Sequence, residues 1–113
     1  MRQTLLLHRV CHGASGMTVA EVLEMATLGS ARVMRLEDRI GSLEPGKRAD
    51  IIQVSFDDVH FVPTYDVTSH LVYVADEQDV ITTIVEGRVL MRDGEILTID
   101  TERVAREGVP ADL

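Results

Sequence analysis

The chain has 113 residues, of which 45% are hydrophobic, and its net charge is −8. Its length suits one soluble domain with a modest core, and its acidity, without any basic run, argues against binding to nucleic acid or anionic lipid. No apolar stretch is long enough to cross a bilayer, we find no signal peptide before His8, and one cysteine excludes an internal disulfide, so we expect a cytoplasmic protein without a membrane partner.

The first apolar segment, Thr4 to Cys11, predicts a helix that ends at Gly13. Four of its side chains would share one face: Leu6, Leu7, Val10 and Cys11. A helix beginning at the first residue would lack its cap, which suggests a segment cut from something longer, although a frayed natural terminus would look the same. We expect Cys11 to be a buried or half-buried side chain, because no cation other than His8 or His12 is fixed beside its thiol.

The next segment predicts an amphipathic helix, Val19 to Leu28. Thr18 followed by Glu21 makes a capping box, and apolar residues recur at i, i+3, i+4 and i+7, namely Val19, Val22, Leu23 and Ala26. Gly29 predicts a break before a second helix, Ser30 to Leu36. The triplet 37–39 then predicts a charged, solvated turn.

The stretch Ile40 to Ser55 predicts the change from helix to sheet. Within it, Glu44-Pro45-Gly46-Lys47 fits a type II turn, because proline presets the second position and glycine accepts a positive φ at the third. Ala49 to Ser55 is apolar enough for a buried strand. Asp57 to Pro63 predicts a loop, and Tyr65 to Ala75 fits either a strand or a short buried helix.

Three strands in a meander are predicted next: Val80 to Glu86, Val89 to Met91 and Glu95 to Ile99. Gly87 and Asp93-Gly94 supply the reversals between them. The tail, Asp100 to Leu113, is polar, and Glu102 and Arg106 have the spacing of a weak helical ion pair.

Residues 41–47 match the first seven positions of a phosphate-binding loop. However, Arg48 stands where the motif needs a hydroxyl for magnesium, and Glu44 would push a carboxylate toward the phosphates. A strand also follows where the motif needs a helix. We therefore reject nucleotide binding.

The four histidines are the obvious candidate metal ligands: His8, His12, His60 and His70. The first two have i, i+4 spacing, but Arg9 stands where the zinc-protease pattern has glutamate, and Gly13 ends the helix. We expect a surface or partly buried pair there, and structural roles for the other two. No serine lies in a G-x-S-x-G elbow. The sequence thus predicts no catalytic, cofactor-binding or metal-binding residue.

Four segments, in this order, resemble the C-terminal part of amidohydrolase-superfamily enzymes: Val22 to Thr27, Gly41 to Lys47, Ala49 to Ile52, and Val85 to Val89 followed by Asp93-Gly94. The resemblance covers roughly residues 3–105 and is nearest to triazine hydrolases and to guanine, oxoguanine and adenosylhomocysteine deaminases. It implies a parent with a metal-bearing (β/α)₈ barrel and a β-sandwich built from both chain ends. The metal would activate water for attack on a C–N or C–halogen bond.

The resemblance implies an α+β chain with two parts. Residues 1–36 would be the last barrel helices, and residues 37–113 the C-terminal half of the sandwich. The metal ligands of such enzymes lie upstream of the matched region, so no catalytic residue carries over. Zinc or iron is expected in the full-length parent and no cofactor in this chain.

Three interpretations follow. The preferred one is a C-terminal fragment of a metal-dependent hydrolase acting on C–N bonds, such as a deaminase of a purine-like or triazine-like ring, inactive alone. Its partners would be the rest of the parent and other copies of itself, because uncovered helices and an open sheet edge favour self-association. The rival is a free-standing β-sandwich module for binding or assembly. A small enzyme using His8, His12 and a carboxylate is the third.

Overall fold

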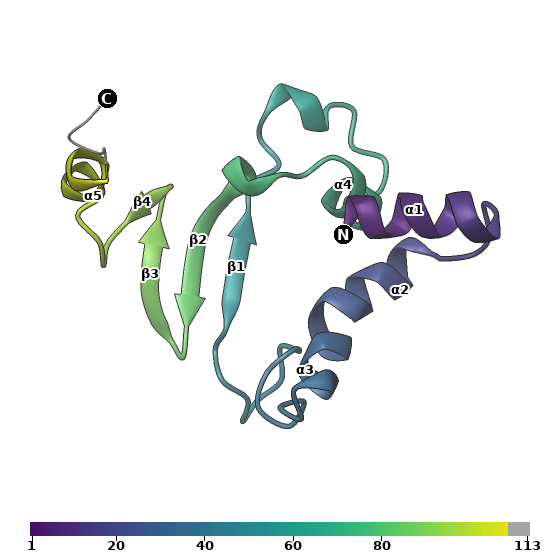
Figure 1. Cartoon of the computed structure of the whole chain (residues 1–113), viewed down its shortest axis with the longest axis horizontal. Helices are drawn as coiled ribbons and strands as arrows, with labels where there is room; N and C mark the ends of the chain where they lie inside the picture. The colour runs from purple at the N-terminus through teal and green to yellow at the C-terminus, as the bar shows by residue number, and fades with distance from the viewer. Residues whose placement is uncertain (109–113) are drawn as a thin grey trace.

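A computed structural model describes residues 1–108. The first four helices lie on one side of the molecule and a four-stranded antiparallel sheet, ordered β1-β2-β3-β4, lies on the other, with the last helix beyond β4 (Figure 1). The helices are α1 (Arg2–His12), α2 (Val19–Glu24), α3 (Ser30–Val33), α4 (Val67–Tyr73) and α5 (Thr101–Glu107). The strands are β1 (Ile51–Val54), β2 (Val80–Val85), β3 (Arg88–Arg92) and β4 (Glu95–Ile96). The predicted α+β class is confirmed.

Helix α1 is apolar on two sides. Leu5, which the predicted face left out, is fully buried, whereas Leu7 and Val10 of that face are 66% and 83% exposed. Cys11 is exposed as well, so the expectation of a buried or half-buried thiol is wrong. The reason is that Leu5 is the one fully buried side chain of α1, and nothing among residues 1–108 covers the side of the helix that carries Leu7 and Val10.

The capping box that begins α2 is confirmed. The Thr18 hydroxyl accepts a hydrogen bond from the Glu21 backbone N–H (3.2 Å), and the Glu21 carboxylate accepts one from the Thr18 backbone N–H (2.7 Å). These bonds satisfy two of the free amides at the start of the helix.

The predicted helix break at Gly29 is wrong. The chain continues from α2 through a π-helical turn, Met25–Gly29, directly into α3. Side-chain hydroxyls of Thr27 and Ser30 donate to the carbonyls of Leu23 (2.8 Å) and Met25 (2.7 Å) along this wider turn. A Cβ at position 29 would lie 3.1 Å from the Glu24 carbonyl oxygen, so glycine serves close packing there and not a break.

The second predicted helix is shorter than expected. α3 ends at Val33, and Arg35 takes a left-handed conformation with φ of 57°. In the following turn Glu37 is half-buried, and its Oε2 is buried with no hydrogen-bond partner, so the prediction of a fully solvated turn is wrong at this residue. After this turn the chain passes close to Ala31 at Gly41, which has φ of +91°. A Cβ at position 41 would lie 2.7 Å from the Ala31 Cβ.

The type II turn before β1 is confirmed. The Lys47 N–H donates to the Glu44 carbonyl (3.1 Å), and Gly46 has φ of +95°. β1 itself is shorter than predicted and is not buried, since Ile52 is exposed. The cause is that β1 pairs with β2 on one side only and stands at the edge of the sheet.

Between β1 and β2 the chain rises as an arch, residues 56–66, above the end of the sheet (Figure 1). The predicted loop contains a 3₁₀ turn, Val59–Phe61. The segment that sequence left open between strand and helix is helix α4, whose N-terminus is capped by the Asp66 carboxylate accepting from the Ser69 N–H (2.8 Å).

The meander is confirmed, with β2, β3 and β4 paired in sequence order. β4 has two residues where the sequence predicted five. In α5 the pair in range is Arg103 with Glu107 (3.9 Å) rather than the predicted Glu102 with Arg106. Residues 109–113 of the predicted tail lie outside the described part of the chain.

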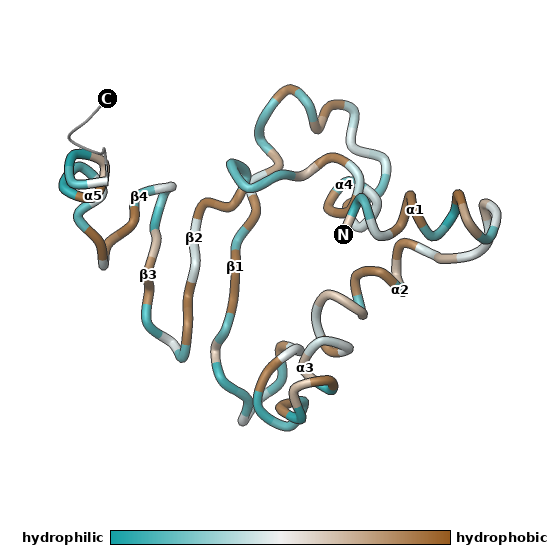
Figure 2. The backbone as a smooth tube through the Cα atoms, in the orientation of Figure 1, coloured by the Kyte–Doolittle hydropathy of each residue, from teal (hydrophilic) through white to brown (hydrophobic). Residues whose placement is uncertain are grey.

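Two small cores hold these elements together. Leu5, Met17, Val22 and Val72 form one cluster where α1, α2 and α4 meet, with Val19 and Tyr73 packed against it. Phe61 of the arch is fully buried and stacks on Phe56 with ring centroids 4.3 Å apart. Many apolar residues lie outside both clusters, and they are spread over every part of the fold in Figure 2.

Candidate functional site

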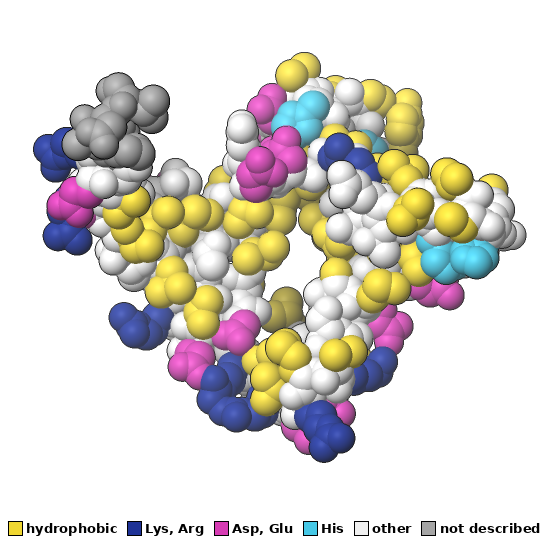
Figure 3. All heavy atoms as spheres, viewed as in Figure 1, with side chains coloured by type: hydrophobic (Ala, Val, Ile, Leu, Met, Phe, Trp, Pro, Cys, Tyr) yellow, Lys and Arg dark blue, Asp and Glu magenta, His cyan; other side chains and the backbone are white. Residues whose placement is uncertain are grey.

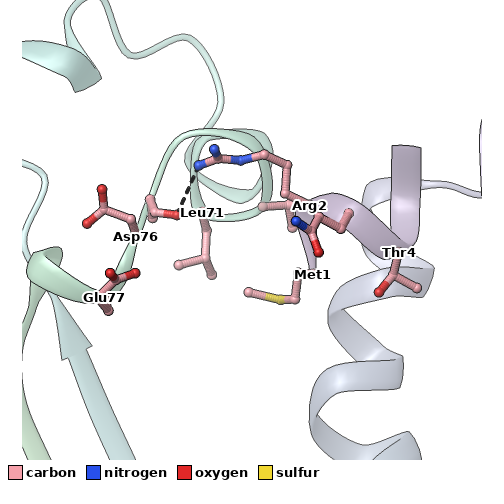
Figure 4. A pocket seen from close by; sticks show the side chains of 9 residues that line it. Met1, Arg2, Thr4, Leu71, Asp76 and Glu77 are labelled. Carbon is pink, nitrogen blue, oxygen red and sulfur yellow. Dashed lines mark hydrogen bonds between the residues drawn. The ribbon is translucent and has the colours of Figure 1, made fainter. Parts of the chain in front are cut away.

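The molecule has a pocket of about 400 Å³ between the start of α1 and the end of α4 (Figure 4). Arg2 reaches over the C-terminal end of α4 and donates to the carbonyls of Val74 (2.9 Å) and Ala75 (3.4 Å). Asp76 at the rim caps the following 3₁₀ turn by accepting from the Gln78 N–H (2.9 Å). Arg2 and Asp76 are therefore engaged in holding the fold.

Arg9 performs a similar structural role at the other end of α1. Its Nε donates to the Met17 carbonyl (3.0 Å), and its guanidinium donates to the Tyr73 hydroxyl (2.6 Å). The sequence analysis treated Arg9 only as a mismatch to a metal motif. Nothing local in the sequence signals this clamp, because its partners lie 8 and 64 residues away.

The His8 and His12 rings share one side of α1, as their spacing predicts, with centroids 4.5 Å apart. The His8 Nδ1 is buried without a hydrogen-bond partner, and His12 is exposed. Among residues 1–108 no group of three or more histidine, cysteine, aspartate or glutamate side chains could hold a metal ion. A metal centre thus has no ligand set in the described part of the chain.

The rings of the other two histidines each lie within hydrogen-bonding distance of an oxygen atom. His60 Nε2 lies 3.2 Å from the Asp79 carboxylate, and His70 Nδ1 lies 2.9 Å from the Asp66 carbonyl oxygen. Asp79 also accepts from the Asp76 N–H (2.9 Å). The Asp76 N–H, and after it His60, hold the pKa of Asp79 below its usual range, against the opposing effect of burial.

The loop that mimics a phosphate-binding motif holds a closed polar network. The Lys47 Nζ donates to the Ser42 hydroxyl (2.6 Å), which donates in turn to Glu44. The Ser42 hydroxyl, and after it Lys47, lower the pKa of Glu44. The Ser42 hydroxyl is therefore engaged by both Lys47 and Glu44. The segment precedes strand β1, where a phosphate-binding loop needs a helix.

An open apolar cleft of about 490 Å³ separates the helices from the sheet, and Figure 3 shows the opening near the centre of the molecule. One wall comes from Ala31 and Met34, the other from Ile51 and Ile52 of β1, and Leu71 lies between them. The free edge of β1 borders this cleft.

The whole chain exposes more surface than a compact protein of its size. Its accessible surface is 8659 Å² and its mass 12.5 kDa, whereas a folded monomer of that mass exposes about 6,200 Å². Its radius of gyration is 17.4 Å, against about 13 Å for a compact domain of this length. Within residues 1–108, no helix has the length and apolar character needed to cross a membrane.

Residues 1–90 match the model of the Amidohydrolase family. A 5-methylthioadenosine/S-adenosylhomocysteine deaminase from Desulfitobacterium hafniense is 43% identical over 107 residues, which cover 95% of this chain and 25% of that protein. A zinc-bound adenosine deaminase from Xanthomonas campestris has a TM-score of 0.90 at 32% identity, covering 94% of this chain and 24% of its own.

The zinc complex of an atrazine chlorohydrolase from Arthrobacter aurescens aligns over the same shares of the two chains, with a TM-score of 0.84 and 29% identity. The chain thus spans about a quarter of the length of the relatives it matches.

Proposed function

The chain belongs to the amidohydrolase family, and we propose that it is the C-terminal quarter of a metal-dependent hydrolase that acts on carbon–nitrogen bonds. The resemblance carried by the four sequence segments is confirmed at the level of the family. In this proposal residues 1–36 supply the last helices of a barrel, and residues 37–113 supply half of a β-sandwich.

The observation that carries the proposal is the excess surface. The chain exposes about 2,500 Å² more than a compact monomer of its mass. That is the area that one partner contributes to a large, obligate interface. Exposed apolar residues such as Leu7, Val10 and Leu43 account for part of it. Such a surface suits a piece that completes a larger body better than a free-standing binding module.

The residues of this chain do not fit the metal that the family implies. No group of three or more potential ligands converges among residues 1–108, and His8 and His12 make a pair without a third. Zinc is bound by two of the similar structures, so in this proposal the metal is held by the rest of the parent. The chain's own contribution is structural, and no catalytic step is assigned to its residues.

The similarity to deaminases supports an adenosine-type substrate for the parent. Deamination can be monitored by the loss of the adenine absorbance band. We expect the full-length parent, loaded with zinc, to deaminate 5′-methylthioadenosine or S-adenosylhomocysteine, and the 113-residue chain alone to show neither deamination nor one equivalent of zinc. Metal-dependent deamination by the chain alone, abolished by His8→Ala or His12→Ala, would overturn the proposal.

The open surface also predicts self-association of the isolated chain. We expect light scattering after size exclusion to give a mass of at least twice 12.5 kDa at micromolar concentration, because pairing at the β1 edge or exchange of the helices covers apolar surface. Replacing the edge residue Ile52 with lysine is expected to shift the population toward monomer if the edge is used. A monodisperse monomer for the unmodified chain contradicts the prediction.

A further inference from the structure

His60, in the 3₁₀ turn of the arch, lies between two carboxylates. Its Nε2 is 3.2 Å from the Asp79 oxygens, and its Nδ1 is 3.7 Å from the Asp58 Oδ2. The imidazole also packs on the Phe61 ring, with centroids 4.3 Å apart. One titratable ring therefore contacts both the 3₁₀ turn of the arch and the segment that leads into β2.

Asp79 is a fixed anchor for this contact. The residue is 7% exposed, its carboxylate accepts from the Asp76 N–H, and its carbonyl accepts from the Ser55 N–H (2.8 Å). It thus joins the end of β1 to the start of β2. The lowered pKa of its carboxyl keeps Asp79 ionised throughout the range in which an imidazole changes charge.

The arch presents an apolar surface to solvent. Val59, Val62 and Tyr65 are 80%, 71% and 88% exposed. Phe61 points the other way and is fully buried. Phe61 stacks on Phe56, and the His60 ring contacts Asp79 across 19 residues of sequence.

We propose that His60 and Asp79 form a pH-sensitive latch, in which protonation of His60 fastens the arch, residues 56–66, to the end of the sheet. The inference concerns this chain alone and does not depend on the proposed deaminase activity.

The direction of the pH effect on the latch follows from the contacts of His60 with Asp79 and Asp58. A neutral imidazole carries one N–H, and if it donates from Nε2 to Asp79, the bare Nδ1 faces the Asp58 carboxylate. A protonated ring presents an N–H to each carboxylate. Protonation of the ring therefore fastens the latch, and loss of that proton loosens it. Asp79 acts in the opposite sense, because its stabilising effect is lost only when strongly acid pH protonates it.

The other titratable groups near His60 do not reproduce this effect. Across the Phe61 ring lies His70 of α4, with centroids 6.4 Å apart, and its Nδ1 is bonded to the backbone of Asp66. Asp66 itself caps α4, and Asp57 interacts with the Ser55 hydroxyl. Only His60 connects the arch to Asp79, so removing its charge isolates the latch.

Hydrogen exchange tests the latch in the 113-residue chain. The reporters are the N–H groups of Phe61 and Val62, which donate to Asp58 and Val59 in the 3₁₀ turn. Protection is expressed relative to the intrinsic exchange rate at each pH, and β2–β3 amides serve as the internal reference. We expect protection of the two reporters to fall about two- to fivefold between about pH 5.5 and 8, since a partly exposed ion pair is lost.

The matched variants decide the cause. His60→Gln, which can still donate to Asp79 but cannot titrate, should abolish the pH dependence, and Asp58→Asn should weaken it while leaving the Asp79 anchor intact. His70→Gln is the control and should retain the full dependence. The proposal is overturned if the unmodified chain shows no pH dependence at the reporters, or if His60→Gln keeps it while the β2–β3 amides remain protected.

Discussion

Replacing Leu5 with alanine is expected to lower the free energy of unfolding by about 2–5 kcal/mol, the range found when a buried leucine is truncated. Leu5 is fully buried and joins α1 to Met17, Val22 and Val72. A whole domain of this kind has a stability of about 5–15 kcal/mol, so the substitution removes a large share of it. Denaturant unfolding followed by circular dichroism measures the loss.

Leu7→Ala is the matched control, because it makes the same chemical change two residues along the same helix at a side chain that is 66% exposed. We expect its effect to stay within about 0.5 kcal/mol, as for ordinary surface positions. Equal losses for the two variants would show that Leu7 is covered in solution, for example by a second copy, and that α1 is not packed as described.

The start of α2 and several turns were predictable because they depend on neighbours in the sequence. Thr18 and Glu21 satisfy each other within four residues, and Gly46 takes the positive φ that its turn requires. The two reversals of the meander follow the same logic. In each case the physical cause lies inside the window that a sequence pattern covers.

The burial of side chains was less predictable. A helical stripe containing Leu7 and Val10 satisfies the pattern of a buried face, yet the buried side chain is Leu5. The periodicity of apolar residues shows that a helix face is apolar, but it does not show which segment packs against that face. In a chain that spans a quarter of its relatives, the partner of such a face can be absent.

Contacts across long sequence separations were missed altogether. Arg9 with Tyr73 and His60 with Asp79 join residues 64 and 19 positions apart. The sequence predicted a structural role for His60, but it offered no partner for its ring. Both contacts tie helices or loops to α4 or to the start of β2, so they determine how the local elements are assembled into the fold.

The absence of a predicted catalytic residue has a different origin. No three potential metal ligands meet among residues 1–108. Lys47 donates a hydrogen bond to Ser42, and Ser30 donates one to a backbone carbonyl, so these side chains have structural partners. The chain is similar to two deaminases over about a quarter of their length. Function in the proposed parent therefore depends on what this surface holds in place.

Replacing Phe61 with alanine is expected to have a comparably large but local effect. Truncation of a buried phenylalanine costs about 3–5 kcal/mol, and Phe61 contacts Phe56 and His60 in a cluster separate from that of Leu5. Because the two clusters share no buried residue, we expect the loss to open the arch while α1 and α2 stay packed. Hydrogen exchange resolved by segment distinguishes this from global unfolding.

Tyr65→Ala is the control for the arch, since this aromatic side chain is 88% exposed and should leave exchange unchanged. The Leu5→Ala chain should show the reverse pattern, with α1 and α2 exchanging faster than the arch. If Phe61→Ala instead raises exchange equally in the arch, in α1 and in β2, the chain unfolds as one cooperative unit. In that case the His60 latch could not loosen the arch alone, because any opening of the arch would open the whole chain.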